Sequence, residues 1–72
     1  MVTYRATIKE RGKDGYLHPE YLIPNDAAKY VEPQFFIDFW GLEMMDVEWY
    51  KVEAFGEDGR RKLICQHNND EQ

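Results

Sequence analysis

Residues 2–9 alternate between apolar and polar side chains along their whole length. Because successive side chains of a β-strand point to opposite faces, a period of two predicts a strand with one buried face and one face in water. Two further stretches, residues 47–55 and 60–66, are typical of strands joined by a turn that begins and ends with glycine. The fold is therefore expected to be built on a sheet.

The second and third of these stretches have an expected register. A four-residue loop at 56–59 would bring side chains of opposite charge or of shared apolar character together across the hairpin. The expected pairs are Glu53 with Lys62, Val52 with Leu63, and Tyr50 with Cys65.

Residues 16–23 leave two interpretations open. After a turn over residues 11–15, which contain two glycines, this stretch can form a short strand paired with the first one. Pro19 lacks an amide donor, so such a strand would be short or would lie at a sheet edge. The alternative is an irregular segment in which His18 and Pro19 open a brief helical turn.

Two short helices are expected in the middle of the chain. Asn25 or Asp26 can cap the first, over residues 27–31, because their side chains accept hydrogen bonds from the free amides of a first turn. Pro33 disfavours helical geometry at the preceding residue and suits the first position of a second helix, residues 33–40. Gly41 is a typical stop at the end of that helix.

Together these elements predict an α+β fold. It would hold a small antiparallel sheet of three or four strands, with one or two short helices packed on one face, in the order β-(β)-α-α-β-β. Residues 1–66 would form a single domain, and the polar residues 67–72 a disordered tail. The chain shows no apolar run near the roughly 20 residues of a membrane span and no secretion signal, so we expect a cytoplasmic protein without membrane contact.

The chain has 72 residues and a single cysteine, Cys65. A core of this size supplies only about 3–5 kcal/mol of stability. One cysteine excludes a disulfide within the chain, and together with His18 and His67 it falls short of the four ligands of a structural zinc site. No metal and no cofactor are expected, and oligomerisation or unusually good packing remains as the stabiliser.

Aromatic side chains are more numerous than one helix on one sheet needs, at 15% of the residues. On a helix over residues 33–40 the apolar side chains span about 200°, whereas a surface helix needs only about 100° to face its core. We expect this helix to make the core and the outer face of the hairpin to contact a partner. Alternatively, the aromatic side chains simply fill the core, with Trp49 covered by residues 16–23 or by the tail. The candidate partner-binding residues are Val47, Trp49, Phe55, Ile64 and Trp40.

The net charge is −5, and it is unevenly spread. Residues 20–58 hold ten acids and two bases, a balance of −8, whereas both ends of the chain are weakly basic. If the first and last strands are neighbours, their bases would form one patch able to contact phosphates. The alternative is a solvated face of surface ion pairs. The candidate phosphate contacts are Arg5, Lys9, Arg11, Arg60, Arg61 and Lys62.

Few residues point to catalysis. Cys65 and His67 are two apart, so on a strand they share a face and can form a thiolate–imidazole pair. Cys65 is nevertheless expected to face Tyr50 as a buried and inert thiol. Asp46 and Glu48 have the same spacing, which arises by chance in a chain with fourteen acids. No catalytic residue is assigned, and an enzyme is not expected.

The sequence therefore favours a small non-catalytic protein-interaction module that can self-associate, for example as a homodimer, through an aromatic and apolar sheet face. The alternative is an accessory protein of nucleic-acid metabolism. It would contact phosphates through the basic strand residues, or it would mimic nucleic acid with its acids. Nucleic-acid binding is disfavoured by the acidic balance.

Overall fold

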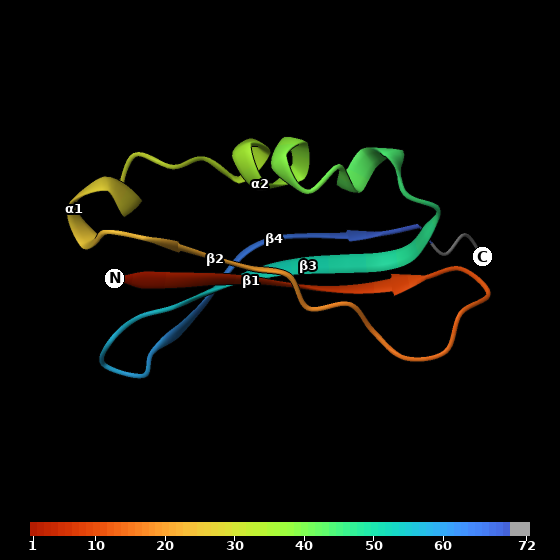
Figure 1. Cartoon of the computed structure of the whole chain (residues 1–72), viewed down its shortest axis with the longest axis horizontal. Coiled ribbons are helices and arrows are strands. Elements are labelled where there is room, and N and C mark those ends of the chain that lie inside the picture. Colours follow the sequence, from red (N-terminus) through yellow and green to blue (C-terminus); the bar gives the residue numbers. More distant parts are fainter. Residues whose placement is uncertain (70–72) are drawn as a thin grey trace.

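The computed structural model describes residues 1–69. Its four strands form one antiparallel sheet in the order β2-β1-β3-β4, and all helices lie over one face of it (Figure 1). The predicted α+β class and element order are confirmed, with the optional strand present. The elements are β1 (Val2–Glu10), β2 (Glu20–Ile23), α1 (Asn25–Ala28), α2 (Pro33–Phe39), the 3-10 helix η1 (Leu42–Met44), β3 (Val47–Phe55) and β4 (Arg61–Asn68).

The strand predicted from the alternation in residues 2–9 is the central β1, which pairs with β2 on one side and β3 on the other. Its apolar residues Tyr4, Ala6 and Ile8 are buried beneath the helices. The polar residues between them point to the face that no helix covers. The alternation of apolar and polar residues therefore arises because helices cover one face of the sheet and leave the other face open.

The strand interpretation of residues 16–23 is confirmed, and the helical turn at His18 and Pro19 was wrong. Leu17 and Ile8 exchange two backbone hydrogen bonds of 3.0 Å, and the Ala6 amide donates to the Pro19 carbonyl over 3.0 Å. Pro19 has only to accept in this arrangement, so its missing amide is tolerated. The regular strand β2 begins directly after it.

Both predicted helices form, with different ends. The first, α1, begins at Asn25 rather than at residue 27, and Pro24 is its N-cap, so the side-chain caps expected from Asn25 or Asp26 do not form. Pro33 is the first residue of α2, as predicted, and Gly41 follows the helix with a positive φ of 65°. This left-handed conformation suits glycine and lets the chain turn into η1, which was not predicted.

The predicted register of the β3–β4 hairpin was wrong. Phe55 pairs with Arg61, so the loop has five residues, and the Asp58 side chain stabilises it by accepting the Arg60 amide at 3.0 Å. Glu53 then pairs with Leu63, and a bulge follows before Val52 pairs with Cys65. Leu63 therefore points to the uncovered face.

Bulges also move two residues that were expected on the uncovered face. Ile64 is the extra residue of the β4 bulge and packs against the core. A second irregularity, where Lys9 pairs with Trp49 but Glu10 pairs with Val47, turns Val47 inward. Val47 is only 2% exposed and belongs to the core. Strict alternation fails at both points because a bulge adds a residue without adding a partner.

The core lies between the helical layer and the sheet. Phe36 of α2 is 1% exposed and stacks on the ring of Tyr4, with centroids 4.5 Å apart. Its other side meets the ring of Trp40 at 5.2 Å. Leu42 of η1 is buried in the same cluster, so the unpredicted 3-10 turn completes the cover over the sheet.

The C-terminal strand runs further than expected. The tail was predicted to start at His67, but β4 continues to Asn68, and the Asn69 amide donates to the Glu48 carbonyl at 2.8 Å. Residues 70–72 of the predicted tail lie outside the described residues. No helix within residues 1–69 is long and apolar enough to cross a membrane.

Replacing Phe36 with alanine should lower the free energy of unfolding by about 3–5 kcal/mol, because it removes a buried ring and leaves a cavity. Urea unfolding followed by circular dichroism measures this loss. Phe39→Ala, on the exposed side of the same helix, is the matched control and should cost less than about 1 kcal/mol. Equal losses in both variants would contradict the assigned orientation of α2.

Candidate protein-interaction surface

The rings of α2 divide between the core and the surface. Phe36 faces the sheet, whereas Phe35 and Phe39 are 41% and 56% exposed. These two residues are one turn apart on the same side of the helix. Their rings stack with centroids 5.7 Å apart and an angle of 8° between planes. The wide apolar arc of this helix thus exceeds what the sheet can bury.

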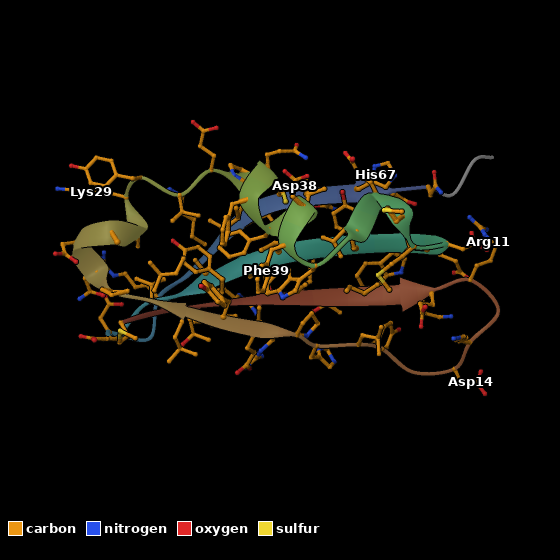
Figure 2. All side chains as sticks on the ribbon, turned by 45° about the horizontal axis from the view of Figure 1, so that its top comes forward. Arg11, Asp14, Lys29, Asp38, Phe39 and His67 are labelled. Atoms are coloured by element: carbon orange, nitrogen blue, oxygen red, sulfur yellow. The ribbon has the colours of Figure 1, made fainter. Side chains whose placement is uncertain are left out.

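Tyr21 of β2 joins the two exposed phenylalanines. It pairs with Tyr4, so its side chain lies on the helix-covered side of the sheet. Its ring contacts Phe39 at 5.0 Å and Phe35 at 5.8 Å between centroids, and it remains 37% exposed. Figure 2 shows Phe39 on the side of α2 that faces β1 and β2. We call Tyr21, Phe35 and Phe39 the aromatic patch.

Sequence reasoning missed this patch as a surface because it assigned the whole face of the helix to the core. The signal was present in the 200° apolar arc, since one helix on one sheet buries only about half of it. Tyr21 carried no signal of its own, because its side of the strand depended on the register with β1. Scattered exposed apolar residues are ordinary, but rings in mutual contact at a surface are typical of contact sites.

The uncovered face of the sheet is less open than expected. Trp49 and Phe55 do lie on it, and both are half-buried. The Tyr16 ring packs on Trp49 with centroids 5.7 Å apart, which is the cover by residues 16–23 considered as an alternative. The Arg5 guanidinium lies 4.8 Å from the centroid of the Phe55 ring, a cation–π contact.

The structure does not bring the five candidate partner-binding residues together. Trp49 and Phe55 are near opposite ends of β3 on the uncovered face, whereas Val47, Ile64 and Trp40 belong to the core or pack against it. Trp40 is half-buried against Phe36. These five residues therefore form no continuous surface.

The candidate phosphate contacts form two groups instead of one patch. Strand β3 lies between β1 and β4, so the first and last strands are not neighbours. Arg60 lies in the hairpin loop and Arg61 and Lys62 begin β4, while Lys9 and Arg11 lie at the other end of the sheet, and Arg5 lies on β1 opposite Glu53. Figure 2 shows Arg11 at the far end of β1. The molecule is 39 Å long, so these groups are well separated.

Most of the bases are also neutralised. Five of the six candidates take part in ion pairs, and Lys62 is in none of those found within residues 1–69. Surface pairs of this kind stabilise little, about 0–1 kcal/mol each, but they leave less charge for a phosphate. The pairs are Arg5–Glu20 at 2.8 Å, Arg11–Asp46 at 3.1 Å, Arg60–Asp58 at 3.4 Å, Arg61–Glu53 at 3.6 Å and Lys9–Glu48 at 3.7 Å.

The acids of the helical layer, unlike these bases, are not neutralised by ion pairs within residues 1–69. None of the ion pairs found among residues 1–69 includes an acid from α1, α2, η1 or the segments between them. Asp38 accepts a hydrogen bond from the Gln34 amide at 2.9 Å, which leaves its charge in place. The helical layer therefore carries acids whose charge is offset by none of the ion pairs found within residues 1–69. These acids are Asp26, Glu32, Asp38 and Glu43.

Cys65 and His67 lie on one face of β4, as the spacing predicted. Burial raises the pKa of the Cys65 thiol, which keeps it protonated near neutral pH, whereas a nucleophilic thiol needs a lowered pKa. The His67 ring stacks on Tyr50 at 5.3 Å. No group of three or more metal-ligating side chains gathers anywhere in residues 1–69.

The surface hollows are shallow. One of about 280 Å³ lies beside Tyr16 and Leu17, and one of about 190 Å³ lies between η1 and the end of β4. Sites for small ligands usually enclose roughly 300–1,000 Å³. Neither hollow borders the aromatic patch.

No family model, no curated protein and no solved structure matches this chain.

Alkaline pH should destabilise the protein. Burial raises the pKa of Tyr4, Tyr50 and Cys65 above their ordinary values of 10.0, 10.0 and 9.0. The folded state holds these protons more tightly than the unfolded state, so the stabilisation is complete below the ordinary pKa and is lost as pH rises through the folded pKa. The free energy of unfolding, measured in urea, should fall as pH rises from about 8.5 to 11.

Cys65→Ser supplies the control for this profile, because it removes the group with the lowest ordinary pKa of the three. Its free energy of unfolding should fall less between about pH 8.5 and 10 than that of the unsubstituted protein. Parallel profiles over that interval would show that Cys65 does not contribute.

Proposed function

We propose that this protein is a protein-interaction module and that the aromatic patch is its contact surface. The observation that carries the proposal is the mutual packing of Tyr21, Phe35 and Phe39 at the surface, each more than a third exposed. Burying an exposed aromatic or large aliphatic side chain contributes roughly 1.5–3 kcal/mol. Only the exposed part of each ring remains to be buried, so the three rings contribute a share of the free energy of association and flanking residues must contribute the rest.

The patch also has the preorganisation that interaction sites use. The stacked rings of Phe35 and Phe39 stand on a helix fixed by buried Phe36, and Tyr21 stands on a paired strand. Aromatic side chains with few rotatable bonds lose little conformational entropy on binding, which is one reason they dominate binding hot spots.

The patch is better supported as a contact surface than the uncovered sheet face. On that face Trp49 and Phe55 are already in contact with Tyr16 and Arg5, and its charges are arranged in ion pairs. The nucleic-acid alternative has no comparable support, because the basic residues are split between two ends of the sheet and mostly paired.

The test compares two variants in affinity capture from the native host. Phe35→Ser/Phe39→Ser removes two rings of the patch, and Met44→Ser removes a still more exposed apolar side chain outside it. Proteins retained by the unsubstituted chain should be lost, by at least about tenfold in recovered amount, only with the patch variant, since each hot-spot residue contributes about 2 kcal/mol or more. Equal retention by both variants would refute the proposal.

A further inference from the structure

The free edge of β2 offers unpaired backbone groups beside the aromatic patch. Leu17 and Ile8 exchange two hydrogen bonds, and pairs of this kind recur at every second residue of an antiparallel ladder. The pairs of Tyr21 with Tyr4 and of Ile23 with Val2 are therefore also of this kind. The amides and carbonyls of the alternate residues, Glu20 and Leu22, consequently point away from β1 to the open edge.

This edge is easier to extend than the other one. The β4 edge is interrupted by the Ile64 bulge and begins with the charged Arg61 and Lys62, features that block pairing with another strand. Strand β2 carries no bulge, and Glu20, Tyr21 and Leu22 are all exposed. Proline on either side of it confines any added ladder to about four residues, which also restricts its register.

We propose that two copies of this chain pair through β2 in antiparallel orientation, with the two-fold axis at Tyr21, to form a continuous eight-stranded sheet. The proposal rests on the proposed function of the aromatic patch as a contact surface, and it names a second copy as the occupant.

The register follows from the outward-pointing backbone groups. Glu20 must lie opposite Leu22 of the second copy for the two residues to exchange both hydrogen bonds. The symmetry repeats this pair, so four backbone hydrogen bonds form. Tyr21 then lies opposite its own symmetry mate, in the type of pair where side chains approach most closely.

The side chains agree with this symmetry. A two-fold axis perpendicular to the sheet leaves both helical layers on the same side, so the two aromatic patches meet across the axis. The outer side of the junction receives Leu22 next to Glu20 of the second copy. Glu20 keeps its ion pair with Arg5 at 2.8 Å, so no charge is buried without a partner.

The buried area predicts a weak dimer. With about 200 Å² for each aromatic side chain, the exposed fractions of Tyr21, Phe35 and Phe39 correspond to roughly 270 Å² per copy. A stable interface buries about 800 Å² per partner, so the rings supply about a third and the strands and flanking residues must supply the rest. We therefore expect a dissociation constant in the micromolar range.

The salt dependence of binding distinguishes a second copy of this chain from a basic partner. Each copy carries a net charge of −5. Two such copies repel each other, so added salt should strengthen the dimer by screening the repulsion. A basic partner would bind more weakly as salt is added.

Sedimentation equilibrium of the full chain, from about 5 to 500 μM and at low and high salt, tests the proposal. A monomer–dimer equilibrium that tightens with salt is expected. Leu22→Pro removes one edge amide without removing a bond to β1, and should weaken the dimer at least tenfold because two symmetry-related hydrogen bonds are lost. Leu22→Ala keeps the amide and should change the constant less than Leu22→Pro.

Phe35→Ser/Phe39→Ser provides a second variant that leaves the β2 backbone intact, and it too should weaken the dimer at least tenfold. Circular dichroism verifies that both variants fold. A strict monomer at 500 μM, a dimer unaffected by Leu22→Pro, or a dimer that dissociates as salt rises would overturn the inference. If the unsubstituted chain is a monomer yet captures another protein through the patch, only the second copy is excluded and the proposed function stands.

Discussion

The stacking of Phe36 on Tyr4 is the contact on which the rest of the structure depends. It joins α2, the longest helix within residues 1–69, to β1, one of the two inner strands of the sheet. Because helix α2 is held by that ring, its neighbouring rings have fixed directions. Trp40 stacks on Phe36, and Phe35 and Phe39 contact Tyr21 of β2. The same contact that makes the core therefore also positions the exposed aromatic patch.

The two faces of the sheet differ in how many of their charged side chains form ion pairs. On the uncovered side of the sheet, arginine and lysine lie next to acids, and the aromatic rings there are in contact with Tyr16 or Arg5. On the helical side, the acids take part in none of the ion pairs found within residues 1–69, and three aromatic rings remain exposed. An apolar surface on a protein of net charge −5 is selective, because apolar contact attracts many partners while the charge rejects those of the same sign.

Sequence periodicity predicted the elements well and their exact pairing poorly. The alternation in β1, the position of Pro33 and the limits of β3 were all readable, because each depends on local geometry. The register of β4 was not, since an extra loop residue and the Ile64 bulge depend on contacts across the hairpin. Val47 was placed on the wrong face because of a separate irregularity, in the ladder between β1 and β3.

The position of the aromatic patch, like the register of β4, could not be predicted from the local sequence. The apolar arc of residues 33–40 predicted more aromatic surface than the core can bury, and the structure leaves Phe35 and Phe39 exposed. The position of this exposed surface could not be predicted, because it depends on which strand lies beneath the exposed side of the helix. Tyr21 joins Phe35 and Phe39 only through the β1–β2 register, which nothing in the local sequence of residues 20–23 specifies.

The strand order β2-β1-β3-β4 has a consequence for how the chain folds. The central ladder joins β1 to β3, with Thr3 opposite Phe55, so the two middle strands come from distant parts of the chain. The entropy of closing this long loop must be overcome before the central ladder or the Phe36 contact can form. Hairpins and helices appear within microseconds, but a sheet whose centre is non-local typically folds in milliseconds to seconds. Before the core forms, the aromatic side chains are open to contact with other copies, and the charge balance of −8 in residues 20–58 opposes that contact by repulsion.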